Sequence, residues 1–166
     1  MTKILLVDEQ DKPIGYGDKL AVHVAGLRHR AFSVFIVNSA GQCLLQKRAA
    51  GKYHSGGLWS NACCGHFETP KVSIRAVRRR LAEEMGLDCD LWPAGIVAYR
   101  VPVGQGLVED EINHIFIGLS DQEPRPDPQE AAAYRYLSPA ELRRDLSLNP
   151  DRYSEWLKII LARIDF

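Results

Sequence analysis

The sequence predicts an α+β fold, in which a mixed β-sheet and helices form layers. Three observations predict it. Extended apolar segments dominate the N-terminal third, a long amphipathic helix lies near the middle, and further strands precede two C-terminal helices. This order lacks the regular alternation of a βαβ series. The chain of 166 residues fits one domain, which we expect to span residues 1–166.

The N-terminal strands are expected to form two hairpins. A short apolar run at the N-terminus ends at Asp8, and turn-forming residues 8–15 separate it from a second extended piece. Residues 31–37 are apolar and rich in β-branched and aromatic side chains, which is typical of a buried strand. A turn at residues 38–41 then leads to a strand over residues 42–48.

The middle of the chain combines a long loop with the clearest helix. Residues 49–62 are rich in glycine and polar groups, and long loops in compact domains tend to be functional. A helix is expected over residues 70–85, with Thr69 as its cap, Pro70 at its first position and Gly86 just past its end. Its apolar stripe consists of Ile74, Val77, Leu81 and Met85.

The C-terminal part predicts three strands and two helices. Strands are expected over residues 95–101 and 107–119, and a short one over residues 134–137 follows a proline-rich connector. A capping-box pattern that starts at Ser138 predicts a short helix. A last helix is expected after Pro150.

The composition excludes several classes of partner. Lysine plus arginine equals aspartate plus glutamate, at 21 each, so bulk charge gives no case for a nucleic-acid or membrane partner. No apolar stretch approaches a membrane span, and the N-terminal run is too short for a secretory signal. The four cysteines are therefore expected to be reduced thiols in the cytoplasm. Nothing in the sequence indicates an obligate partner, so we expect a monomer.

The first candidate for chemistry is Asn-Ala-Cys-Cys-Gly-His at residues 61–66. Cys64 and His66 place a thiol and an imidazole two residues apart, beside a glycine that lets the backbone come close. This arrangement suits catalysis or metal binding. Cys63 would point to the opposite face of an extended chain. Taken alone, the motif is better explained by cysteines that act as small buried hydrophobic side chains.

The second candidate is Glu109-Asp110-Glu111, within an otherwise apolar extended stretch. Strand alternation puts Glu109 and Glu111 on one face and Asp110 on the other. Two adjacent carboxylates repel unless a cation lies between them or one is protonated. A solvated edge strand is the simpler alternative, but residues 112–119 have a buried pattern, which favours metal binding.

Histidines would supply the remaining metal ligands. His23 and His29 lie in a polar connector before a strand, where histidines are ordinarily surface residues. Combined with the candidates above, they complete a nitrogen and oxygen set that suits Zn²⁺, Mn²⁺ or Mg²⁺. The full set is His23, His29, His66, Glu109 and Glu111. His54 and His114 are not accompanied by other candidate ligands in the sequence, and we expect them to be structural or exposed.

Charged residues of the central helix are a further candidate. Arg80 and Glu84 lie one turn apart and share a face. A surface ion pair is the usual explanation of this spacing. A helix that holds Mg²⁺ through an acid while a base grips phosphate would show the same pattern. Lys19, Arg48 and Lys52 are further cations, each of which alone would simply be solvated.

Residues 65–87 resemble a degenerate Nudix box, whose general form is G-x5-E-x7-R-E-U-x-E-E-x-G-U with U aliphatic. Lys71 replaces the first glutamate, and Arg80 replaces the glutamate that follows the arginine. Both acids help to assemble that family's metal site, so their loss argues against ordinary Nudix diphosphate hydrolysis. The matching residues are Gly65, Arg79, Leu81, Glu83, Glu84, Gly86 and Leu87.

The same departures resemble the type 1 isopentenyl-diphosphate isomerases, and the likeness runs from the N-terminus to about Trp156. It implies a Nudix-type fold with the β-sheet packed between helices. Single motifs are weak, but their joint order and spacing are specific. They are Asn-x-x-Cys-Gly-His at 61–66, Arg-x-x-x-Glu-x-Gly at 80–86, Tyr-Arg at 99–100 and Glu-x-Glu at 109–111.

The resemblance implies a role for each matched residue. Cys64 and Glu111 match the two catalytic groups, with Tyr99 and Trp156 as active-site aromatics. The implied ligands of one divalent metal (Mn²⁺, Zn²⁺ or Mg²⁺) are His23, His29, His66, Glu109 and Glu111. Glu84 matches an acid that helps to bind Mg²⁺ on the substrate diphosphate. Cations that contact this diphosphate match Lys19, Arg48, Lys52 and Arg80.

The implied reaction converts isopentenyl diphosphate into dimethylallyl diphosphate by a 1,3-allylic proton shift. Glu111, with Tyr99 beside it, is expected to protonate the terminal methylene, and Cys64 as thiolate to remove a proton from the carbon nearer the oxygen. The two roles could be exchanged for other substrates or in the reverse reaction. Trp156, if it is not simply core, would stabilise the cation with its indole face.

Two other functions stay open. A Nudix hydrolase would need a fuller set of glutamates on the helix and would not need Cys64. A non-catalytic metal-dependent binding module would tolerate the loss of both Cys64 and Glu111.

Overall fold

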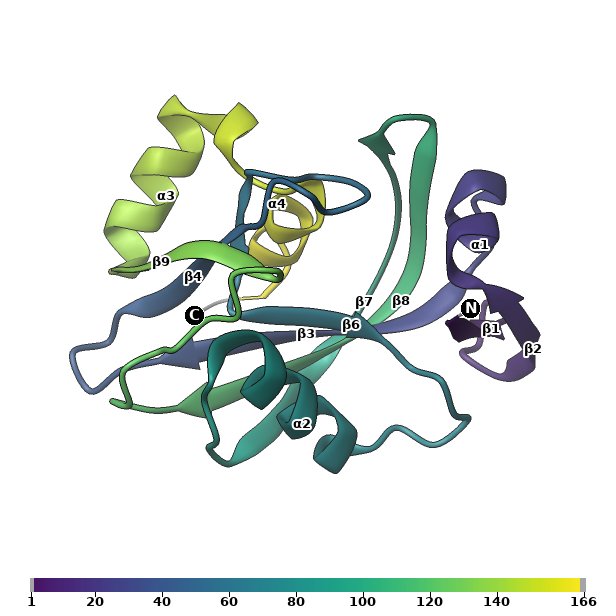
Figure 1. The fold of residues 1–166 in the computed structure, drawn as a ribbon, viewed down its shortest axis with the longest axis horizontal. Coiled ribbons are helices and arrows are strands. Elements are labelled where there is room, and N and C mark those ends of the chain that lie inside the picture. Colours follow the sequence, from purple (N-terminus) through teal and green to yellow (C-terminus); the bar gives the residue numbers. More distant parts are fainter. Residues whose placement is uncertain (1, 165–166) are drawn as a thin grey trace.

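A computed structural model describes residues 2–164; Met1, at the start of the first apolar run, lies outside them. Within this range a nine-stranded sheet has helices on both of its faces (Figure 1). The strands are β1 (Lys3–Val7), β2 (Pro13–Asp18), β3 (His29–Val37), β4 (Cys43–Arg48), β5 (Trp59–Asn61), β6 (Cys63–His66), β7 (Leu91–Gly104), β8 (Leu107–Leu119) and β9 (Ala131–Leu137). The helices are α1 (Lys19–Ala25), α2 (Ile74–Met85), α3 (Pro139–Leu148) and α4 (Glu155–Leu161), with a 3-10 turn at Pro150–Arg152.

Strand β3 is the centre of the sheet. It pairs in parallel with β8 and antiparallel with β1, β4 and β6. In this register His29 lies opposite Glu111 of β8, and Ser33 lies opposite Cys64 of β6. Pairing across β3 therefore brings the two motifs of residues 61–66 and 109–111 to one region of the sheet.

The sheet separates two apolar cores. Val77 of α2 packs in one core with Val34 of β3. Leu157 of α4 packs in the other with Phe35, the next residue of β3. Neighbouring strand residues point to opposite faces, so α2 and α4 cover opposite sides of the sheet. The expected α+β fold with the sheet between helices is confirmed.

Helix α2 begins later than expected. Its first residue is Ile74, and the cap is Ser73, whose side chain accepts a hydrogen bond from the amide of Ala76. The expected start at Pro70 with Thr69 as cap is wrong, because the Pro70 carbonyl accepts a hydrogen bond from Arg30 Nη1 at 2.5 Å. That contact ties residues before the helix to β3. The C-terminal end at Met85, followed by the left-handed Gly86, is as expected.

Three further segments differ from expectation. The connector around His23 forms helix α1, which Asp18 caps and which ends at the left-handed Gly26. The loop of residues 49–62 ends in the short strand β5. After the 3-10 turn at Pro150–Arg152, the last helix starts only at Glu155. Among residues 2–164, no helix is long and apolar enough to cross a membrane.

Candidate active site

A cavity of about 580 Å³ is lined by residues of β6, β8, α1, α2, α4 and the loop after β4. It brings together residues that are far apart in the sequence. His23 and His29 lie behind its lining and contact Glu109, and Tyr99 contacts Glu111. The lining includes Lys19, Arg48, Lys52, Cys64, His66, Arg80, Glu84, Glu109, Glu111 and Trp156.

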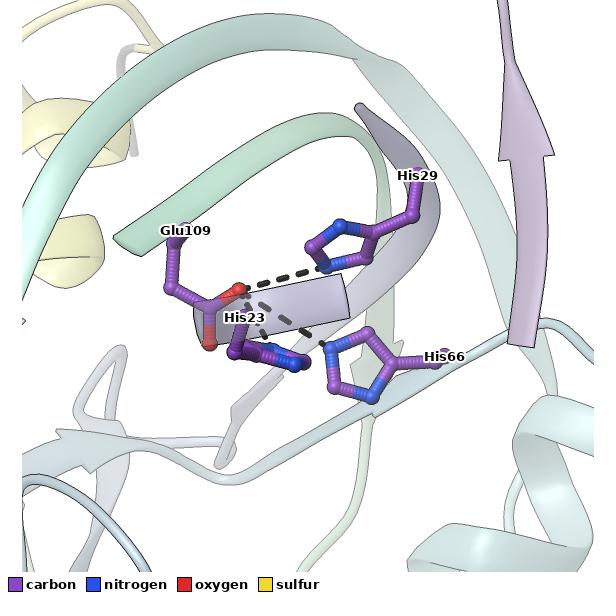
Figure 2. Close-up of side chains that lie close together, drawn as sticks. All are labelled: His23, His29, His66 and Glu109. Carbon is purple, nitrogen blue, oxygen red and sulfur yellow. Dashed lines mark ion pairs between the residues drawn. The ribbon is translucent and has the colours of Figure 1, made fainter. Parts of the chain in front are cut away.

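Three histidines surround one carboxylate oxygen at this cavity (Figure 2). Glu109 Oε2 lies 3.0 Å from His23 Nε2, 3.2 Å from His29 Nε2 and 4.0 Å from His66 Nε2. The side chains come from α1, β3, β6 and β8. The four potential ligand atoms all lie within 4.8 Å of one another. We call these four residues the His/Glu cluster.

Backbone contacts orient two of the imidazoles. His23 Nδ1 lies 2.6 Å from the carbonyl of Lys19, one helical turn earlier, and His29 Nδ1 lies 2.8 Å from the carbonyl of Leu27. A carbonyl can only accept, so Nδ1 carries the hydrogen in both rings. In the neutral rings Nε2 therefore carries the lone pair and faces Glu109, and in His23 the Tyr53 hydroxyl also lies 3.3 Å from this nitrogen. Such outer contacts commonly fix metal-binding imidazoles.

The His/Glu cluster fits a divalent cation. His29 Nε2 and Glu109 Oε2 are fully buried, and neither makes a hydrogen bond of good geometry within residues 2–164. Burial alone would raise the pKa of Glu109, but the surrounding imidazoles hold it well below its usual range. Burial alone would lower the pKa of His29, but Glu109 and Glu111 raise it to about 10. A bound cation would take the place of that proton, as metal ligation generally does.

Glu111 connects the cluster to a phenol. Its Oε1 lies 3.3 Å from His66 Nε2 and 3.5 Å from His29 Nε2. Its Oε2 accepts hydrogen bonds from the Tyr99 hydroxyl and from Asn113 Nδ2, the latter at 2.8 Å. Tyr99 lies opposite Glu111 in the β7–β8 register, which explains their contact. Burial and the nearby Glu111 raise the pKa of Tyr99, so its hydroxyl keeps its proton.

Asn61 joins Cys64 to Trp156. Its Oδ1 accepts hydrogen bonds from Cys64 Sγ at 3.1 Å and from Trp156 Nε1 at 3.2 Å. Burial, followed by the charge of Glu84, raises the pKa of Cys64 to about 11. A pKa raised in this way favours the thiol form at neutral pH, whereas the resemblance implied a thiolate. Trp156 belongs to the core beneath α4 and also lines the cavity.

Cations and acids form a network on the α2 side of the cavity. Arg80 Nη2 lies 2.7 Å from Glu84 Oε1 and 3.4 Å from Glu130 Oε1, and Lys52 also pairs with Glu130. Gln46 Nε2 donates to the second oxygen of Glu84 at 2.9 Å. Glu84 is buried, so this pair is not the solvated surface pair of the simpler interpretation. No sequence motif marked Glu130.

The other two cations lie against aromatic rings. The Arg48 guanidinium carbon is 5.1 Å from the Trp156 ring centre, and Lys19 Nζ is 4.6 Å from the Tyr53 ring centre. Burial and the neighbouring Lys52 lower the pKa of Lys19. Both contacts hold positive charge at the cavity wall.

The expectation for His54 is wrong in one respect. His54 is buried, and its Nε2 lies 2.9 Å from Glu109 Oε1, so it touches the candidate site. No local motif marked it, because its loop conformation decides where the ring lies. His114 pairs with Asp11 at 2.8 Å and does not line the cavity, which agrees with a structural role.

Comparisons with known proteins identify the family. The NUDIX domain family matches residues 27–157. The isopentenyl-diphosphate Delta-isomerase of Pectobacterium atrosepticum is 44% identical over 164 residues, which cover 99% of this chain and 92% of that protein. Isopentenyl-diphosphate Delta-isomerase 2 of Aromatoleum aromaticum is 46% identical over 162 residues, covering 98% and 86% respectively. The chain belongs to the isopentenyl-diphosphate Delta-isomerase family.

More distantly related proteins share the fold of this isopentenyl-diphosphate Delta-isomerase family member. The Deinococcus radiodurans protein DR0079 superposes with a TM-score of 0.82 at 18% identity, over 99% of each chain. A MutT NUDIX hydrolase from Burkholderia pseudomallei superposes with a TM-score of 0.64 at 20% identity, over 83% of this chain and 98% of that one. At these identities the likeness is one of fold alone. The expected resemblance to a Nudix-fold isomerase is confirmed.

Proposed function

We propose that this chain interconverts isopentenyl diphosphate and dimethylallyl diphosphate in isoprenoid biosynthesis by a 1,3-allylic proton shift. One observation carries the proposal: Cys64 and Glu111 line a single cavity together with Trp156 and a set of cations. A proton shift needs one group that gives a proton and another that takes one. The relatives that are 44% and 46% identical are named for this activity.

The two proton-transfer groups would act on different carbons. A proton is added to the terminal methylene, which leaves a tertiary carbocation, and another is then lost from the carbon nearer the diphosphate. We propose Glu111, with the hydroxyl of Tyr99 against it, for the methylene and Cys64 for the other carbon. The Trp156 indole would stabilise the carbocation by about 2 kcal/mol when desolvated. The apolar side chains around α4 would keep water from quenching it.

The alternative assignment places Cys64 at the methylene and Glu111 at the other carbon. The raised pKa of Cys64 leaves a proton on the thiol, while His29 and His66 help to lower the pKa of Glu111 against the effect of burial. Deuterium exchange separates the two assignments. If Glu111 serves the methylene, Cys64→Ala should still exchange deuterium into the methylene of isopentenyl diphosphate without forming isomer. If Cys64 serves it, Glu111→Gln should keep that exchange and Cys64→Ala should lose it.

We propose two positions for divalent metals. The first is the His/Glu cluster with Glu111, and the ion would be Mn²⁺, Zn²⁺ or Mg²⁺. The second is Glu84, which would hold Mg²⁺ carried by the substrate diphosphate, while Lys19, Arg48, Lys52 and Arg80 contact the phosphates. A metal in the cluster would supply positive charge that sets the acidity of its neighbours. The cations anchor the diphosphate and so position the alkene.

Proton NMR of the protein with isopentenyl diphosphate and Mg²⁺ in D₂O tests the function. We expect dimethylallyl diphosphate that carries deuterium. Release of phosphate or monophosphate without isomer would instead indicate a Nudix hydrolase. No change with metal-loaded protein would contradict the isomerase and favour a binding module.

Replacement of the thiol tests the catalytic pair. Cys64→Ala is expected to abolish turnover because no other described thiol lines the cavity. Cys43→Ala is the matched control, since Cys43 is also a free thiol but is buried and does not line the cavity. Isomer formation by NMR and the melting temperature of each variant are the measurements. Near-normal turnover of Cys64→Ala would remove this residue from the mechanism.

We further propose that the chain acts as a single-domain monomer in the cytoplasm, on a small-molecule diphosphate and without nucleic-acid or membrane partners. The equal numbers of acidic and basic residues, 21 each, support the absence of a polyanionic partner. Four free cysteines support a reducing compartment.

A further inference from the structure

A fourth imidazole contacts the His/Glu cluster through the Glu109 oxygen that the other three do not face. His54 Nε2 lies 2.9 Å from Glu109 Oε1, whereas His23 and His29 face Oε2, at 3.0 Å and 3.2 Å. The two carboxylate oxygens thus have different neighbours. Oε2 faces the potential ligands, and Oε1 faces His54.

The His54 ring has little freedom to turn away. It is 3% exposed, and its Nδ1 lies 3.2 Å from the hydroxyl of Ser55. The Tyr53 ring centre is 4.3 Å away, and Trp156 packs edge-on at 5.6 Å with an interplanar angle of 87°. Aromatic contacts on two sides and a polar contact at Nδ1 leave Nε2 aimed at Glu109. Beside an ionised carboxylate oxygen, Nε2 carries the hydrogen and donates it.

We propose that His54 is a positioning residue that fixes the rotation of the Glu109 carboxylate and so raises the affinity of the cluster for a divalent metal. The inference rests on the metal site proposed above. The terminal torsion of a glutamate is soft, so a carboxylate held at one oxygen only samples many orientations. A hydrogen bond to Oε1 leaves Oε2 as the oxygen directed at the three imidazoles. Without it, Oε1 would be buried and unsatisfied.

The same contact links the metal site to the wall that would face the carbocation. His54 touches Glu109 at one end and Trp156 at its edge, so the orientation of the carboxylate and the packing of the indole depend on one ring. Loss of the His54 ring should therefore lower the metal affinity of the protein even in the absence of substrate.

Two substitutions separate positioning from packing. Leucine at position 54 keeps an apolar side chain of similar size but has no donor. Glutamine places an amide hydrogen near the position of Nε2. Mn²⁺ is titrated into metal-free protein, and the electron paramagnetic resonance signal of the free ion counts unbound metal. His114→Leu is the matched control, because His114 Nε2 also contacts a carboxylate, Asp11, at 2.8 Å but away from the cluster.

We expect His54→Leu to lose roughly 10–100-fold in Mn²⁺ affinity, as is typical when an outer contact of a metal ligand is removed. His54→Gln and His114→Leu should stay within about 3-fold of the unmodified chain, well short of that loss. Circular dichroism of the metal-free variants checks that the fold is kept.

Three results would overturn the inference. Unchanged affinity of His54→Leu would make the ring a packing residue only. An equal loss in His54→Gln would make His54 a direct metal ligand instead of a positioning residue. If the unmodified chain bound no Mn²⁺, the proposed metal site itself would fail and the role of His54 with it.

Discussion

The two faces of strand β8 carry carboxylates in very different surroundings. Asp110 lies 2.8 Å from Arg28 Nε and 3.3 Å from Arg100 Nη1, so permanently charged groups neutralise it. Glu109 and Glu111, one residue to either side, have imidazoles, a phenol and an amide as neighbours. Arginine cannot give up its proton in a protein, whereas imidazole can be neutral and offer a lone pair.

This difference separates a structural carboxylate from the two proposed functional ones on the same strand. The partners of Asp110 are permanently charged, so they neutralise it and can neither bind a metal nor exchange a proton. The partners of Glu109 and Glu111 can exchange a proton for a metal ion or pass it on. Burial alone therefore does not identify a site, since all three acids are buried. The chemistry of the neighbouring groups does.

The largest expected difference between the faces is in turnover. Glu111→Gln should lower the rate of isomer formation by roughly 10²–10⁴-fold, the usual contribution of a general acid or base. Asp110→Asn removes the same charge from the other face and should keep turnover within a few-fold. Steady-state NMR assays of both variants at saturating Mg²⁺ measure this. Equal losses of turnover in the two variants would show that the total charge of β8 matters for turnover, and that the face on which the carboxylate lies does not.

Metal removal should give the next largest effect, on thermal stability. A ligand at 100 times its dissociation constant stabilises the fold by about 2.7 kcal/mol, which is roughly 5–10 °C in melting temperature for a chain of this size. Chelation of the cluster metal should remove that shift in the unmodified chain and in Asp110→Asn. The melting temperature of Glu109→Gln should be nearly the same with and without the metal. Calorimetry with and without chelator measures it, and a full shift in Glu109→Gln would exclude Glu109 as a ligand.

A smaller effect, on the free energy of unfolding, is expected when the Asp110 carboxylate is removed from the other face of β8. Asp110→Asn should lower the free energy of unfolding by about 1–2 kcal/mol, because two guanidinium groups lose the buried carboxylate charge that they contact. Urea unfolding of Asp110→Asn, Arg28→Ala and the double variant gives the coupling energy of the pair. A coupling near zero would show that the contact with Arg28 does not stabilise the fold.

The smallest expected effect concerns an acid outside both faces. Hydrogen bonds from Tyr153 and then Asn149 lower the pKa of Asp145 to about 2, from a usual 3.8. The contribution of Asp145 to stability is therefore present above about pH 3.8 and is lost as the pH falls towards about 2. Asp145→Asn should be less stable at pH 5 and approach the unmodified chain near pH 2. Urea unfolding across this range checks it, and a constant difference would contradict the assigned cause.

Local patterns predicted a large part of the fold and of the candidate site. Strand alternation placed Glu109 and Glu111 on one face, and β8 confirms it. The same alternation put Cys63 and Cys64 on different faces, and they lie in different cores. Helix α2 was found, apart from its start, because its apolar stripe has a clear period.

The missing parts depend on contacts that local patterns do not encode. Helix α1 is short, and its apolar residues Leu20 and Val24 are exposed, so it lacks the stripe that marks a helix. Its cap Asp18 and its end Gly26 were the available signals. His54 and Glu130 reach the cavity through loop conformation and packing between distant segments. A single sequence has no spacing that reports such contacts.

The parallel pairing of β3 with β8 also sets the order in which the site can assemble. Arg28 and Asp110, at the edge of this pairing, are 82 positions apart in the chain. A ribosome adds roughly 5–20 residues per second, so all three cluster histidines exist for seconds before Glu109 is made. Closing so long a loop is slow compared with forming a hairpin. The nascent chain therefore carries an incomplete set of the proposed ligands until β8 is synthesised, and metal binding at the proposed site would come late and report completed folding.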